Sequence, residues 1–202
     1  MNKEVEESLG QALSKLKDEE REKEEKRYKK LWGKIKVPFT LHEGLGKYTK
    51  AELDLIRKTL DIKNASGLKK AELIEVLQQQ IPEILQSISM LWDKERFTLL
   101  ATIASNNGVI SVPKKLGMEQ VEYLRSTGLI YSGTLENEQV LTIPEELIEP
   151  IKALNHDLSV RAVINRNTEW IKLTSGLLYY YGTLTVSQLI QMLEKYIKGK
   201  VN

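Results

Sequence analysis

Residues 48–82, YTKAELDLIRKTLDIKNASGLKKAELIEVLQQQIP, carry the clearest secondary-structure signals of the sequence. Thr49 and Glu52 match a capping box, in which the hydroxyl accepts a hydrogen bond from an early backbone N–H and the carboxylate reaches back. Apolar residues then recur at helical spacing up to Leu60 and again over about 68–80. The stretch therefore predicts two short helices that pack against each other.

A turn joins the two predicted helices. It runs from Asp61 to Gly67 and contains Asn64 and Ser66, which are typical turn residues. Pro82 follows the second helix and marks either a break or the first turn of a third helix.

The helical pair resembles the SAP motif and its relative at the N-terminus of the transcription terminator Rho. The family pattern is a Leu-rich helix, a loop with small residues and Gly, a basic pair and a second Leu-rich helix. The resemblance covers about a sixth of the chain. SAP-like units contact nucleic acid through the loop and the start of the second helix. Carried over to this sequence, the resemblance implies contacts from Asn64, Ser66, Gly67, Lys69 and Lys70.

Physical chemistry points to the same place independently. A helix N-terminus presents free N–H groups and a partial positive charge, and Lys69 and Lys70 add two full charges there. Phosphate contacts of this kind give affinity without sequence information. Residues 47–77 hold seven basic and five acidic residues, a local net charge of +2. The alternative is a helical hairpin with a solvated lysine pair that docks on a protein.

The composition of the whole chain excludes several function classes. Its 202 residues suffice for one or two domains, and 30 basic against 28 acidic residues give a net charge of only +2. Bulk charge therefore does not select nucleic acid, and any basic surface has to be local. The absence of Cys excludes disulfides, thiolate zinc sites and cysteine nucleophiles, and two His are few for a metal or catalytic site. We predict a non-enzymatic protein with no metal and no cofactor.

The sequence predicts no membrane segment. No apolar run approaches the length that spans a bilayer, and the N-terminus lacks the apolar stretch of a secretory signal. The expected location is cytoplasmic.

Residues 1–36 are predicted to form a charged N-terminal helix. Nearly every residue from Lys17 to Lys30 is charged, with acids four positions before bases, an order that stabilises a helix by about 0.2–0.5 kcal/mol per pair. The first turns carry an apolar stripe, which predicts docking on a protein partner or self-association. The stripe consists of Val5, Leu9, Leu13 and Leu16.

A basic stretch ends this segment. Residues 26–36, KRYKKLWGKIK, hold six basic residues, no acid and two aromatics. The cations could contact phosphates while Tyr28 or Trp32 stacks on a base. The alternative is a helix end whose cations complement the dipole, followed by a Trp that packs on the core. If the SAP-like interpretation holds, the phosphate track extends through Arg27, Lys29 and Lys30.

The order of elements across residues 94–143 resembles a winged helix in outline: helix, strand, short helix, helix, strand, turn, strand. The helix at 119–126 would then enter the major groove of DNA. It carries Glu119 and Glu122, which phosphates repel, and the predicted wing has no basic residue. We therefore expect a structural or protein-binding winged helix rather than a DNA reader.

These observations predict a mainly α protein: a SAP-like helical hairpin and a winged-helix-like domain with a short β-hairpin and extra C-terminal helices. The leading hypothesis is a nucleic-acid-binding accessory factor, transcription-related or DNA-associated, with the choice between DNA and RNA left open. The alternative is a protein–protein adaptor with a structural winged helix and a docking N-terminal helix. The predicted parts are 1–36, 37–82, 83–154 and 155–202.

Overall fold

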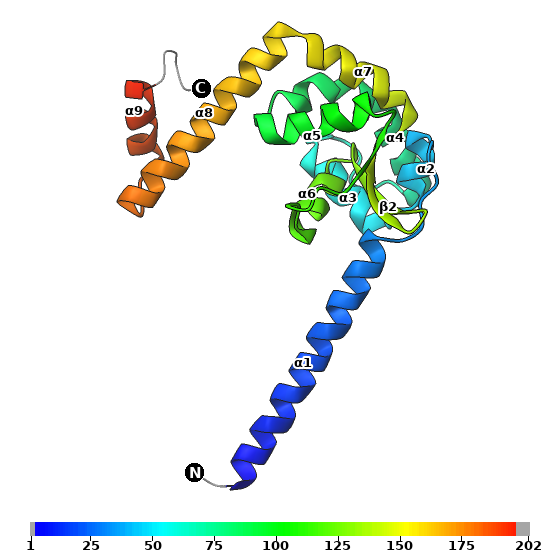
Figure 1. Cartoon of the computed structure of the whole chain (residues 1–202), viewed down its shortest axis with the longest axis vertical. Coiled ribbons are helices and arrows are strands. Elements are labelled where there is room, and N and C mark those ends of the chain that lie inside the picture. Colours follow the sequence, from blue (N-terminus) through cyan, green and yellow to red (C-terminus); the bar gives the residue numbers. More distant parts are fainter. Residues whose placement is uncertain (1–2, 197–202) are drawn as a thin grey trace.

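The computed structural model describes residues 3–196, with side chains described from Ala12 onward. The chain is mainly helical with one small antiparallel sheet, as predicted (Figure 1). The helices are α1 (Lys3–Leu31), α2 (Leu41–Gly46), α3 (Lys50–Thr59), α4 (Lys70–Ser89), α5 (Lys94–Ser105), α6 (Met118–Ser126), α7 (Glu145–His156), α8 (Leu158–Tyr181) and α9 (Val186–Tyr196), and the strands are β1 (Val109–Ser111), β2 (Tyr131–Leu135) and β3 (Glu138–Thr142).

Helix α4 is the central element of the core. It packs against α2 and α3 and also against α7 and α8, with a buried stripe that includes Leu73, Leu77 and Ile81. Both alternatives predicted at Pro82, a break and the first turn of a third helix, are wrong, because α4 continues through it to Ser89. A proline inside a helix costs about 3 kcal/mol. Leu85 and Ile88 are buried beyond Pro82, and each contributes about 1.5–3 kcal/mol, which offsets that cost.

One buried cluster extends over most of the body. It contains side chains from Leu31 at the end of α1 to Ile151 in α7. The predicted boundary between the parts 37–82 and 83–154 falls inside α4. The helical pair and the sheet therefore share a hydrophobic core.

The sheet holds the end of α1. Its strand order is β1–β3–β2, and both neighbouring pairs are antiparallel, which confirms the predicted hairpin. The Thr134 N–H in β2 donates to the Gly33 carbonyl (2.9 Å), so the chain after α1 lies along the edge of β2. The hydroxyls of Ser132 and Thr134 donate to the carbonyls of Leu31 (2.7 Å) and Trp32 (2.8 Å). The last carbonyls of a helix have no N–H partner within the helix, and these bonds provide donors for two carbonyls at the end of α1.

Helix α2 lies inside the segment 32–47, which the glycines and proline of the sequence mark as a loop. Thr40 and Glu43 form a capping box: the Thr40 N–H donates to the Glu43 carboxylate (2.8 Å) and the Thr40 hydroxyl accepts from the Glu43 N–H (3.2 Å). Gly44 allows α2 to approach the sheet, because a Cβ there would lie 2.7 Å from Phe39 and 2.8 Å from Tyr131. Gly44 suggests a loop in the sequence, but in the structure it is needed for the close packing of α2 on the sheet.

Helices α8 and α9 form a hairpin that leaves the body. The start of α8 packs through Val160 and Ile164 against Phe97 of α5. The Thr168 hydroxyl accepts from the Lys94 N–H (2.8 Å), and beyond this point α8 projects with α9 folded back along it (Figure 1). In α9 only Leu193 is fully buried among the described side chains.

Substitution of Gly128, between α6 and β2, tests the core contact with α3 and α4. Gly128 has a φ of +69°, and a Cβ there would lie 2.9 Å from Ile56 and 3.1 Å from Ile81. We expect Gly128→Ala to lower the free energy of unfolding by more than about 1 kcal/mol, measured by urea denaturation. Gly46→Ala is the matched control, because its Cβ meets no atom within 4 Å. Equal stability of the two variants would contradict this packing.

Candidate nucleic-acid interface

Four lysines belong to the segments that meet at the start of α4. Lys70 donates to the carbonyl of Gly46 (2.9 Å), and Lys50 donates to the carbonyl of Leu68. Lys47 follows Gly46 in the chain, and its ammonium lies 5.7 Å from the centre of the Phe39 ring, whereas Lys69 follows Leu68. We call this group the lysine cluster; it consists of Lys47, Lys50, Lys69 and Lys70.

The turn before α4 presents the other predicted contact residues. Ile62 and Ala65 are buried and hold the turn against the body. Asn64, Ser66 and Gly67 are exposed between and after them. The structure therefore places the five contact residues implied by the resemblance on one accessible turn and helix start.

The N-terminus of α4 is partly free. The Lys69 N–H donates to the carboxylate of Glu72 (2.7 Å). The N–H groups of Lys70 and Ala71 have no acceptor within residues 3–196. These two groups and the helix dipole favour an anion, whereas the Glu72 carboxylate opposes one.

The electrostatic balance of the lysine cluster remains positive. Lys50 lies 3.5 Å from Asp54, the charge of Lys47 contributes to lowering the pKa of Glu43, and Glu72 caps α4, so three carboxylates offset part of the charge of the four lysines. Lys70 is bonded to a neutral carbonyl, which leaves its charge uncompensated. The cluster can therefore attract a phosphate by charge and by backbone N–H groups together.

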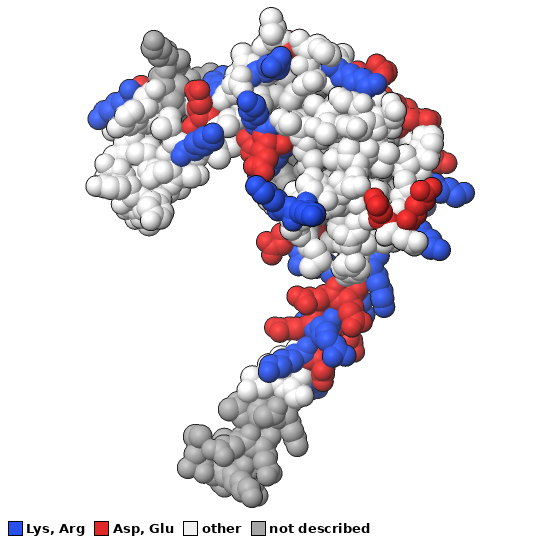
Figure 2. Space-filling view, viewed as in Figure 1, with Lys and Arg blue, Asp and Glu red and all other residues white. Residues whose placement is uncertain are grey.

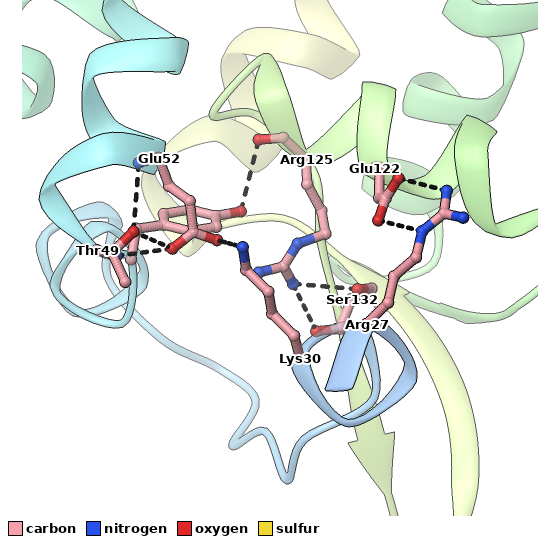
Figure 3. Close-up of polar contacts among 8 residues, drawn as sticks. Arg27, Lys30, Thr49, Glu52, Glu122, Arg125 and Ser132 are labelled. Atoms are coloured by element: carbon pink, nitrogen blue, oxygen red, sulfur yellow. Dashed lines mark hydrogen bonds and ion pairs between the residues drawn. The ribbon is translucent and has the colours of Figure 1, made fainter. Parts of the chain in front are cut away.

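The basic stretch at the end of α1 has a different role. Arg27 forms a bidentate ion pair with Glu122 of α6, with distances of 2.6 Å from Nε and 2.5 Å from Nη2. Lys30 lies 3.1 Å from Glu52 of α3 (Figure 3). These pairs fix the direction in which α1 leaves the body. Lys29 is exposed and has no ion pair within the described side chains.

Only one of the α1 cations approaches the lysine cluster. Glu52, the partner of Lys30, also accepts from the Thr49 N–H (2.8 Å), directly before Lys50. Lys30 thus lies at the edge of the lysine cluster, where its ion pair with Glu52 connects α1 to α3. Arg27 instead faces α6 through Glu122 (Figure 3).

Both carboxylates of these pairs have shifted acidities. Burial raises the pKa of Glu52, but hydrogen bonds from Thr49 and Lys30 outweigh it, and the pKa lies below its ordinary value. Hydrogen bonds from Arg27 lower the pKa of Glu122. Both groups are therefore ionised at neutral pH, as their ion pairs require.

A small cavity of about 200 Å³ lies between α1, α3 and α6. Lys30 and Arg125 line it together with Glu52 and Glu122, so its charges cancel. The Arg125 guanidinium donates to the Ser132 carbonyl (3.2 Å) and lies 4.9 Å from the centre of the Tyr48 ring. Lys30 and Arg125 therefore connect elements of the fold, and the cavity contains no uncompensated charge that would attract a ligand.

The aromatic residues of the basic stretch are also engaged. The Tyr28 hydroxyl accepts from the Gln139 side chain of β3 (2.8 Å), although half of the Tyr28 surface is exposed. Trp32 is half-buried against the core, in agreement with the packing alternative. On the face drawn in Figure 2, acidic and basic side chains are mixed along α1, and no single positive stripe appears there.

The described residues contain no cluster of three or more His, Asp or Glu that could hold a metal ion. Within residues 3–196, no helix combines the length and apolar character needed to cross a membrane.

The Arg27–Glu122 pair predicts a pH dependence. The pKa of Glu122 is lower in the folded chain than its ordinary 4.5, so the pair stabilises the fold above that value and is lost as pH falls through the folded pKa. We expect Glu122→Gln to lower Tm at neutral pH by no more than about 2–4 °C, because both side chains are partly exposed. The difference from the wild type disappears at acidic pH. Glu169→Gln on α8 serves as control, because Glu169 is exposed and has no ion pair among the described side chains, and an equal effect there would contradict the assignment.

Comparisons of the chain with known protein families, with curated proteins and with solved structures found no match. The resemblances to the SAP motif and to a winged helix therefore depend on the residues of this chain and on their arrangement. Function has to be argued from the same residues.

Proposed function

We propose that the protein is a non-enzymatic nucleic-acid-binding factor that holds phosphates at the lysine cluster. The observation that carries this proposal is the pair of hydrogen bonds from Lys50 and Lys70. They hold Lys50 and Lys70 close to the start of α4, where two backbone N–H groups have no acceptor among the described residues, and Lys47 and Lys69 directly follow the two acceptor residues in the chain. Anion binding by a helix N-terminus that is flanked by lysines needs no further chemistry.

The packing of α3 and α4 supports the SAP-like interpretation. The two helices bury Leu53 and Ile56 against Leu73 and Leu77, and the turn between them stays exposed. A phosphate contact there gives affinity but no base readout, so binding is expected to be independent of sequence. DNA and RNA both present such phosphates. The proposed location is cytoplasmic.

A winged-helix-like unit is part of the proposal, in a structural role. The element order α5–β1–α6–β2–β3 and the sheet order β1–β3–β2 support this unit, but the short helix expected between β1 and α6 is wrong, because residues 112–117 form only a turn. The helix that would read DNA is α6, and Glu122 on that helix binds Arg27 of α1. With an acid at its surface and α1 beside it, α6 is a poor partner for phosphates.

Charge reversal at the lysine cluster tests the proposal. We expect the wild type to bind labelled single- or double-stranded DNA or RNA in fluorescence anisotropy, with an affinity that falls as salt rises. Lys69→Glu with Lys70→Glu should weaken binding by about tenfold or more and reduce the slope of the log–log salt plot by about 2.

The matched control is Arg161→Glu with Lys172→Glu. Both residues are exposed on α8, and the change in net charge is the same. Retained binding in this control excludes a general charge effect. The proposal is wrong if the wild type binds none of the four nucleic acids at low salt, or if both double variants weaken binding equally.

A specific observation favours the second candidate function, a protein–protein adaptor. Of the 14 large hydrophobic residues that are exposed among the described side chains, eight belong to α8 and α9, whose far end is largely free of charge in Figure 2. Exposed apolar surface of this kind is typical of protein interaction sites. The eight residues are Leu158, Ile171, Leu178, Tyr179, Tyr180, Tyr181, Val186 and Tyr196.

A further inference from the structure

A groove of about 540 Å³ lies between α5 and α6. Its apolar lining includes Leu99 of α5, Ile110 of β1 and Leu116, which are all half-buried, and Tyr123 of α6, which is 45% exposed. The Arg96 guanidinium lies 5.2 Å from the centre of the Tyr123 ring and connects the two helices. This volume falls within the range that buries a ligand or a few anchoring side chains, about 300–1,000 Å³.

Helix α1 carries a second uncovered apolar surface. Every described side chain from Ala12 to Lys26 is exposed, and Leu13 and Leu16 are 51% and 55% exposed. In the sequence Leu9, Leu13 and Leu16 have the spacing i, i+4, i+7. This is the spacing of the anchors with which an amphipathic helix binds an apolar groove.

We propose that two copies of the chain pair reciprocally, each placing the Leu13–Leu16 stripe of its α1 in the α5–α6 groove of the other. This proposal is independent of nucleic-acid binding. The stripe of each chain then binds the groove of the other chain. Because the same contact forms twice, the result is a closed, two-fold dimer.

The geometry of α1 excludes docking in the groove of the same chain. The helix is straight and projects from the body (Figure 1), and Arg27 and Ser132 hold its base. Leu13 precedes Leu31 by 18 residues, which is about 27 Å along the helix axis. No α1 residue lines the groove. The stripe can therefore reach only the groove of another molecule.

The two surfaces match in length. The α5 residues that line the groove from Glu95 to Thr102 span seven steps, about 10 Å of helix. In the sequence Leu9 and Leu16 are also seven residues apart, although the side chains of Val5 and Leu9 lie outside the described ones. The predicted stripe from Leu9 to Leu16 is therefore as long as the α5 part of the groove.

The two surfaces differ in charge over the length of the stripe. Three carboxylates and two cations line the groove, a net charge of −1. The segment 8–17 around the stripe contains no acid and two lysines, Lys15 and Lys17, whereas acidic residues flank it at 4, 6 and 7 and at 18–20. The two lysines favour this pairing when the flanking acids lie beyond the ends of the groove. The charged lining residues are Asp93, Glu95, Glu119, Arg96 and Lys115.

Sedimentation velocity on the full chain and two charge variants tests the pairing. The wild type should reach twice its 23.1 kDa as concentration rises. A stripe variant, Leu13→Glu with Leu16→Glu, and a groove variant, Thr98→Glu with Tyr123→Glu, should each stay monomeric alone. Their mixture should form a dimer that is weaker than that of the wild type, because one of the two contacts pairs an intact stripe with an intact groove, whereas the other brings the new carboxylates together.

The mixture separates this pairing from a coiled coil of two α1 helices. In a coiled coil the groove variant would dimerise alone and the mixture would gain nothing. Leu91→Glu is the control, since Leu91 is 79% exposed and lies outside both surfaces, and it should dimerise as the wild type does. A wild type that is monomeric at all concentrations, or a groove variant that still dimerises, overturns the proposal.

Cross-linking tests the same contact without added charge. The chain has no cysteine, so one cysteine can be introduced in each of two preparations. Leu16→Cys and Tyr123→Cys chains, mixed under oxidising conditions, should form a disulfide between unlike chains. Cross-links only between two Leu16→Cys chains would indicate α1–α1 pairing and overturn the proposal.

Discussion

The continuity of α4 through Pro82 joins the parts of the core that pack before and after the proline. One helix buries Leu73 and Leu77 on one side of the proline and Leu85 and Ile88 on the other. A break at Pro82 would separate α2 and α3 from α7 and α8, because each pair packs on α4. The apolar side chains buried beyond the proline contribute more free energy than the proline costs, so tertiary packing overrides the local signal.

The same helix also determines where the lysine cluster lies. Its first residues stand against the end of α2 and the start of α3, and Lys70 and Lys50 bond across these junctions. The sheet that packs on the other part of the core holds the base of α1 through Ser132 and Thr134. The exposed turn and the projecting helix are therefore attached to a shared core.

Local signals predicted much of the fold. The capping box at Thr49 starts a helix where the sequence predicts one, because the signal and the structure both involve the same four consecutive residues. Thr40 has the same signal, but Gly44 suggests a loop until its contact with Tyr131 is known. Contacts between distant residues leave no periodic trace in the sequence. Arg27 and Glu122 are 95 positions apart, and each looks like a solvated charge.

The structure separates the cations that the sequence groups together. Arg27 and Lys30 bind carboxylates on other helices, so their charges are compensated and their role is to join elements. Lys70 binds a backbone carbonyl, which orders the side chain but leaves its full charge. A phosphate is attracted by uncompensated charge rather than by the number of basic residues. The composition of the chain does not reveal this difference in partners. It is the reason why the start of α4 is a stronger candidate for phosphate binding than the basic stretch of α1.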